Sequence, residues 1–144
     1  MIMPMSRISL LKGKSPEYIR ALADGLQRAL EDSFNVPRND RFQLIHQHDA
    51  HELIFDREYE SPDGARSDDF VLITISAGKP RTTQVKQAFY RRLVDILAES
   101  PGLRPEDVMV VISTTQGDEW SFGGGHSAAS TSNSGPAFSS KGSF

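Results

Sequence analysis

The sequence predicts an α+β domain built from two β-α-β units, whose four strands form a mostly parallel sheet with both helices on one face. A strand–helix–strand pattern occurs twice, over residues 4–47 and 69–114. Both units carry a similar phrase before their closing strand, VPRND at 36–40 and LRPED at 103–107. Crossovers that contain one helix join parallel strands of the same sheet. Helices on one face leave the other face uncovered, so we expect self-association through the sheet into a ring.

The first unit begins with an apolar-rich strand at residues 4–11. Ser15 and Pro16 predict the start of a helix, because serine is a common N-cap and proline fits the first helical position. Apolar residues then recur at three- and four-residue steps to about Ser33, as one buried helix face requires. These residues are Ile19, Leu22, Ala23, Leu26, Leu30 and Phe34. Apolar and polar residues alternate over 41–47, which predicts the second strand.

The stretch from 49 to 69 is acidic, rich in turn residues and weakly periodic. Its Pro-Asp-Gly sequence is typical of a turn. We expect a long connection here, with a short strand at 52–55.

The second unit repeats the first pattern. FVLITISA at 70–77 predicts a β-branched strand, and Thr82 or Thr83 predicts a helix N-cap. The apolar face of the helix is formed by Val85, Phe89, Leu93, Ile96 and Leu97. Prolines at 101 and 105 end this helix, and VMVVIST at 108–114 predicts the closing strand.

Composition narrows the class of protein. At 144 residues the chain is long enough for one packed domain, which we place at 1–123, followed by a Ser/Gly-rich tail at 124–144 that we expect to be disordered. A net charge of -3 with mixed signs argues against nucleic acid as a partner. The absence of cysteine excludes disulfides, thiolate metal sites and a cysteine nucleophile. The N-terminal apolar stretch is interrupted by Arg7 and Lys12, so we expect a cytoplasmic protein without a membrane segment.

Pro4 raises a chemical question because it lies within MIMPM. If translation starts at Met3 and this methionine is removed, Pro4 carries a free secondary amine. If Met1 to Met3 stay attached, its nitrogen is an amide without basicity. The first state is a candidate catalyst, and the second is only the beginning of a strand.

Five features in order carry a family resemblance. They are the proline before the first strand, the Lys-Gly-Lys-Ser turn, VPRNDRFQ after the first helix, the basic turn after the third strand, and WSFG after the fourth. Together they resemble the tautomerase superfamily, most closely its malonate semialdehyde decarboxylase branch and uncharacterised relatives. The resemblance covers residues 4–123. It implies a duplicated β-α-β fold, a homotrimer, no cofactor and a small carboxylate-bearing oxo acid as substrate.

The resemblance also implies roles for individual residues. Pro4 matches the catalytic amino-terminal proline, and Asp40 matches the acidic residue of the decarboxylase pocket. Arg81 matches the second arginine of an Arg-Pro-Arg turn that binds the substrate. Lys79 stands where the first arginine is expected; it keeps the charge but loses the planar fork that grips a carboxylate with two hydrogen bonds.

Trp120 and Phe122 match the aromatic wall of the family's pocket. A pocket of this composition supports two different reactions. An unperturbed terminal amine titrates at about 7.7–8.0. Apolar walls and Arg81 lower that pKa and favour a base for keto–enol proton transfer, whereas Asp40 raises it and favours a cation that stabilises the enolate left by decarboxylation. A third hypothesis is a non-catalytic assembly protein whose first three residues remain attached.

Three histidines suggest a metal site, because His46 and His48 lie on one face of a strand and His51 follows closely. No local motif adds an acidic ligand. We therefore predict structural histidines and no metal.

Overall fold

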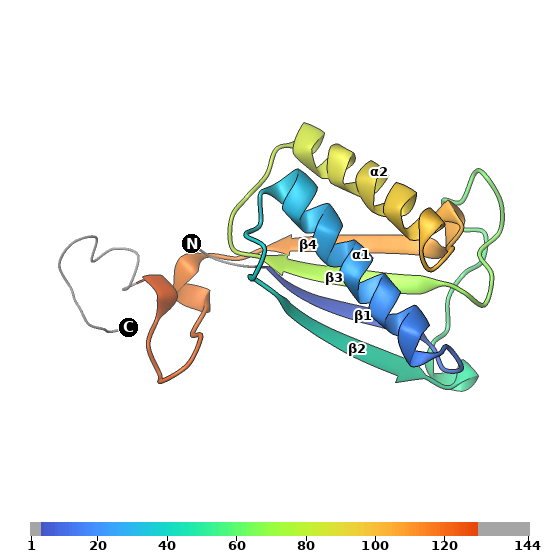
Figure 1. Cartoon of the computed structure of the whole chain (residues 1–144), viewed down its shortest axis with the longest axis horizontal. Coiled ribbons are helices and arrows are strands. Elements are labelled where there is room, and N and C mark those ends of the chain that lie inside the picture. The colour runs from blue at the N-terminus through green and yellow to red at the C-terminus, as the bar shows by residue number, and fades with distance from the viewer. Residues whose placement is uncertain (1–3, 130–144) are drawn as a thin grey trace.

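The antiparallel pairing of two strands joins the two predicted units into one sheet (Figure 1). The computed structural model describes residues 4–129 and gives the strand order β2-β1-β3-β4. The strands are β1 (Met5–Leu11), β2 (Phe42–His48), β3 (Val71–Ala77) and β4 (Val108–Thr114). Each unit contains one parallel pair, and β1 runs antiparallel to β3. Helices α1 (Pro16–Phe34) and α2 (Thr83–Glu99) cover one face, so the predicted fold class is confirmed.

The ends of the helices follow from their capping residues. The Ser15 hydroxyl accepts a hydrogen bond from the Tyr18 amide at 3.0 Å, and Thr82, one of the two predicted N-caps, accepts one from Val85 at 3.2 Å. Helix α1 extends to Phe34, one residue beyond the predicted end. Asn35 ends it in the left-handed conformation, which asparagine tolerates better than most residues.

The core lies between the sheet and the two helices. Ile8 of β1 pairs with Ile73 of β3, and both side chains are fully buried beneath the helices. The helices approach closely at Gly25, where an added Cβ would lie 2.7 Å from the Cδ2 atom of Leu97. This glycine is therefore a requirement of the helix–helix contact rather than of a turn.

The β1–β3 register places the start of each strand beside the end of the other. Met5 pairs with Ser76, and Leu10 pairs with Val71. The residue before β1 therefore meets the turn that follows β3. In the same way, the residue before β3 meets the turn that follows β1. The two units are thus related by an approximate twofold arrangement about the centre of the sheet.

The long connection differs from one detail of the prediction. The expected strand at 52–55 is wrong, because the chain forms a 3-10 helix over Ala50–Glu52 and no strand follows before β3. Local hydrogen bonds explain the difference. The Asp49 amide donates to the Glu52 carboxylate at 2.9 Å, which completes a capping box that competes with an extended backbone.

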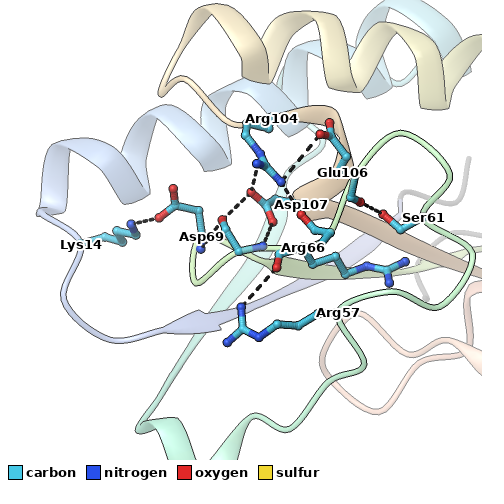
Figure 2. A network of polar contacts seen from close by, with 11 residues as sticks. Lys14, Arg57, Ser61, Arg66, Asp69, Arg104, Glu106 and Asp107 are labelled. Carbon is cyan, nitrogen blue, oxygen red and sulfur yellow. Dashed lines mark hydrogen bonds and ion pairs between the residues drawn. The ribbon is translucent and has the colours of Figure 1, made fainter.

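A buried carboxylate attaches the end of this connection to the domain. Asp107, in the 3-10 helix Pro105–Asp107 before β4, is fully buried and accepts hydrogen bonds from the amide (2.6 Å) and the hydroxyl (2.7 Å) of Ser67. Arg104 lies beside the same carboxylate, with its Nε 3.6 Å away, as Figure 2 shows. Nearby, Lys14 forms an ion pair with Asp69. Polar contacts therefore fill the end of the sheet where β3 begins.

The sheet face opposite the helices is exposed and partly apolar. It carries four of the large hydrophobic side chains that remain exposed, namely Phe42, Leu44, Met109 and Val111. This is the uncovered face that the sequence predicts. Among the described residues, neither α1 nor α2 combines the length and the hydrophobicity of a membrane-spanning helix.

The segment after β4 projects away from the two layers (Figure 1). Its Trp120 and Phe122 rings stack with centroids 5.4 Å apart, and the Ala128 amide donates to the Trp120 carbonyl at 2.9 Å. Residues 124–129, which the sequence places in the tail, thus turn back on this segment. Residues 130–144 lie outside the described part of the chain, so the domain boundary stays a prediction.

Replacing Asp107 with alanine is expected to lower the free energy of unfolding by about 3 kcal/mol, because the buried donors of Ser67 lose their acceptor. Urea denaturation measures this loss. Asp68→Ala is the control: the Asp68 side chain is 79% exposed and pairs with Arg57 at the surface, so little change is expected. Equal stabilities for the two variants would contradict this role of Asp107.

Candidate active site

A cavity of about 270 Å³ lies where the chain enters β1. Three segments far apart in the sequence form its wall: the residue before β1, the end of α1 with the loop after it, and the turn between β3 and α2. The lining includes Pro4, Phe34, Asn35, Lys79, Arg81 and Val85. Three of the predicted site residues, Pro4, Lys79 and Arg81, therefore meet in one cavity.

Pro4 owes its place to the central strand pairing. It is buried and directly precedes β1, whose first residue Met5 pairs with Ser76 near the end of β3. The Gly78–Arg81 turn follows β3 immediately, so the register carries Lys79 and Arg81 to the proline. A secondary amine at this position would face two cations, which disfavour its protonated form.

Arg81 is held by the protein on two sides. Its Nη1 donates to the Lys79 carbonyl at 2.7 Å, and its Nη2 donates to the Phe34 carbonyl at 3.1 Å. The guanidinium carbon also lies 4.5 Å from the centre of the Phe34 ring. Partial burial lowers the pKa of the Arg81 guanidinium from its usual value, but the group stays charged because an arginine pKa lies far above neutrality. The cavity thus presents a fixed positive charge.

Lys79 is exposed at the mouth of this cavity, and its carbonyl serves Arg81. An ammonium group on a flexible stem is a point charge, which can attract an anion without fixing its orientation. Arg81 is therefore the better anchor for a carboxylate, and Lys79 adds charge.

The other predicted site residues lie elsewhere in this chain. Asp40 does not line the cavity: it lies at the end of the loop that leaves it, and its carbonyl accepts a hydrogen bond from Gln27 at 3.1 Å. Trp120 and Phe122 belong to the projecting segment after β4 and line none of this wall. The Trp120 indole donates to the Thr115 hydroxyl at 2.5 Å, which fixes the ring within its own segment.

The sequence pattern predicts Phe34 as a core residue and Asn35 as part of the helix end, and it assigns neither residue to the site. The structure places both in the cavity wall. A signal was present for Asn35, since asparagine at a helix end favours the left-handed conformation that turns the chain there. The apolar period of α1 alone could not show that its last member reaches Arg81.

The three histidines do not gather. His46 and His48 stand on the uncovered sheet face with ring centroids 6.5 Å apart, and His46 Nε2 lies 3.2 Å from Arg7. His51 instead joins Asp49 and Glu52, with their ligand atoms within 4.8 Å of one another. All three of these side chains are exposed, and such groups are common without a bound metal.

A larger hollow of about 760 Å³ runs between α1 and the edge strand β2, but its charges are already paired. Burial alone raises the pKa of the Asp24 carboxyl, yet its ion pairs with Arg41 and Arg20 outweigh this and hold that pKa below its usual value. Lys14 pairs with Asp69. The smaller cavity, which contains Pro4 and the fixed arginine, is therefore the candidate active site.

Comparison with known proteins identifies the family of the chain. Two models described as "Tautomerase enzyme" match the chain, one over residues 40–123 and the other over residues 4–59. Two proteins of Bacillus subtilis (strain 168) are similar in sequence. The chain is 32% identical to probable tautomerase YusQ over 85% of this chain and 95% of that protein, and 30% identical to probable tautomerase YrdN over 84% and 92%.

Solved structures extend the likeness. A malonate semialdehyde decarboxylase, described together with a proline-to-alanine mutant and with decarboxylase and hydratase activities, is 32% identical over 85% of this chain and 92% of its own, with a TM-score of 0.77. A second malonate semialdehyde decarboxylase, inhibited by 3-bromopropiolate, is 31% identical over 94% and 99%, with a TM-score of 0.80. A fused 4-OT symmetric trimer shares the fold at 20% identity over 88% and 98%, with a TM-score of 0.70. A family model matches more than half of the chain, and probable tautomerases resemble it over 84–85% of its length, so this chain belongs to the tautomerase superfamily.

Proposed function

We propose that this protein is an enzyme that uses Pro4, as a free amino terminus, to move a proton between carbon and oxygen of small 2-oxo acids. The observation that carries the proposal is the meeting of Pro4 with Arg81 and Lys79 in one small cavity. Arg81 binds the substrate carboxylate. The proline nitrogen reaches C3, the carbon on the other side of the oxo group. The reaction needs no cofactor.

The proton transfer follows from the charge on the amine. A neutral Pro4 nitrogen takes the proton from the enol hydroxyl and returns it to the adjacent carbon, which leaves the keto acid and the free amine. Arg81 and Lys79 favour this neutral form, because each positive charge raises the free energy of a cationic proline. Burial of Pro4 also favours the neutral amine, because a charged group is less stable in apolar surroundings than in water.

A decarboxylase is the second candidate, and the two malonate semialdehyde decarboxylase structures favour it. In that reaction a cationic Pro4 polarises the carbonyl of a 3-oxo acid. The carbon–carbon bond to the carboxylate breaks, carbon dioxide leaves, and the enolate then takes up a proton. The family pattern implies Asp40 as the partner of this cation, although Asp40 lies outside the cavity wall of this chain. A third candidate, a non-catalytic assembly protein, applies if Met1 to Met3 remain attached.

Assembly into a homotrimer is part of the proposal. The uncovered sheet face, with Phe42, Leu44, Met109 and Val111, supplies apolar surface for contact between subunits. The projecting segment with Trp120 and Phe122 would then reach the pocket of a neighbouring copy, near a subunit boundary, and complete its aromatic wall. We place the enzyme in the cytoplasm.

The first test concerns the amino terminus. A version of the chain that starts at Met3 and loses this methionine should ketonise phenylpyruvate enol measurably, whereas one that retains Met1 and Ile2 should be far slower, since an acylated nitrogen neither accepts a proton nor carries charge. Ultraviolet absorbance follows the enol, and intact mass establishes each terminus. Similar melting temperatures serve as the control. Equal rates would exclude both catalytic roles of Pro4.

Asp40→Asn separates the two enzymatic candidates. If the Asp40 carboxylate holds Pro4 cationic, the amide lowers the proline pKa, suppresses decarboxylation of malonate semialdehyde and leaves or increases tautomerisation. Carbon dioxide release and enol absorbance measure the two reactions. Asp68→Asn, on an exposed and distant carboxylate, is the control. Loss of tautomerisation with decarboxylation unchanged would contradict this role.

Leu44→Asp tests the assembly. Leu44 is 39% exposed on the uncovered face, so a charge there costs little in a single chain but is strongly unfavourable inside a subunit contact. Sedimentation should change from trimer to monomer. Tyr59→Asp, at a residue 66% exposed on the long connection, should leave the trimer intact. A Leu44→Asp trimer of unchanged stability would show that this face is not the interface.

A further inference from the structure

Helix α1 ends against a cation that comes from the other unit. Its last turn contains no basic residue of its own. The final carbonyls of a helix lack partners within the helix and carry partial negative charge. The carbonyl of Phe34, the last residue of α1, accepts its hydrogen bond from Arg81, 47 positions away along the chain. The end of α1 is therefore one of the groups that position the candidate carboxylate anchor.

The same residue contacts Arg81 a second time through its ring. The guanidinium carbon lies 4.5 Å from the Phe34 ring centre, within the range of a cation–π interaction. The hydrogen bond to the Phe34 carbonyl fixes one edge of the guanidinium, and the Phe34 ring packs against its face. With the Lys79 carbonyl as the other acceptor, two of the five N–H donors of Arg81 are used within residues 4–129, and three are left for a ligand.

The Phe34 ring is itself held firmly. The side chain is 4% exposed and packs against the Phe89 ring with centroids 4.7 Å apart. Phe89 belongs to α2 and is fully buried in the hydrophobic core. The surface on which Arg81 rests is thus part of the hydrophobic core, although Phe34 also lines the cavity.

We propose that Phe34 is a positioning residue that aims Arg81 into the cavity and thereby sets the affinity for a carboxylate ligand. An arginine held before the ligand arrives loses less side-chain entropy on binding than a mobile one. The ring acts on binding and leaves the proton transfer at Pro4 unchanged. This inference rests on the proposed function for its ligand class, small oxo acids, but the position of Arg81 can be measured without turnover.

Four variants test the proposal. Phe34→Leu removes the ring and keeps an apolar side chain and the backbone hydrogen bond; Phe34→Tyr retains the aromatic face. Phe70→Leu is the matched control, since Phe70 is 2% exposed and stacks on Phe55 at 4.3 Å. It directly precedes β3, at the opposite end of that strand from the turn in the cavity wall. Arg81→Ala lacks the Nε–Hε group, so it assigns the magnetic resonance signal of the Arg81 side chain. It also gives the KM that results when the carboxylate anchor is lost completely.

In kinetics with phenylpyruvate, Phe34→Leu should raise KM by about fivefold and leave kcat nearly unchanged. A change of this size is expected when one cation–π contact to a half-buried arginine is lost. Phe34→Tyr should restore KM to the wild-type value. Phe70→Leu should lower the melting temperature to a similar extent and leave KM unchanged. An equal rise of KM in Phe70→Leu would overturn the proposal, because the effect would then be one of general stability.

The second readout is nuclear magnetic relaxation of the Arg81 Nε–Hε group in the ligand-free protein. The order parameter of this group should fall in Phe34→Leu. It should keep its wild-type value in Phe34→Tyr and Phe70→Leu. If every version lacks activity but the order falls as expected, the proposed function fails and the positioning role stands. If the order in Phe34→Leu equals that of the wild type, the positioning role is wrong whatever the activity.

Discussion

The antiparallel pairing of β1 with β3 is the constraint on which the rest of the structure depends. Within each unit a helix crossover makes a parallel pair, but only this central register, with Ile8 opposite Ile73, decides which loops of one unit meet the strand ends of the other. It brings the residue before β1 to the turn after β3. A shift by one residue would turn every apolar side chain of β1 to the uncovered face and would separate Pro4 from Arg81.

The two ends of the β1–β3 pair differ in what fills the space beside them. At one end, Pro4 lies beside the turn that carries Arg81, and the space between them is open. At the opposite end, Phe70 and Asp69 lie next to the turn after β1, and polar contacts close that region through Lys14 and the buried Asp107. Asp107 stands in LRPED where VPRND has Asp40. The same sequence phrase therefore anchors a connection at one end of the sheet and lines the open cavity at the other.

Local patterns predicted most of the fold. The apolar period of α1 and α2 and the β-branched run of β3 are dictated by burial against the sheet, so they can be recognised from the sequence. The short strand expected at 52–55 failed, because the capping box of Asp49 and Glu52 outweighed a weak alternation. Of the candidate site, Pro4, Lys79 and Arg81 line one cavity, whereas Trp120 and Phe122 lie in a separate segment, and the roles of all five residues stay predictions. The contact of Phe34 with Arg81 depends on where α1 stops in space, which periodicity cannot state.

The ending of α1 on Arg81 also limits how this chain can change during evolution. Each inserted residue lengthens a helix by 1.5 Å and rotates its end by about 100°. One extra residue within α1 would thus carry both the ring and the terminal carbonyl of Phe34 away from the guanidinium. Within residues 4–129, the connection from β2 to β3 contributes no residue to the cavity wall, so insertions there can leave the cavity intact if they preserve contacts such as that of Ser67 with Asp107. Length variation among relatives should accordingly concentrate in that connection, while the number of residues between the Ser15 cap and Asn35 stays constant.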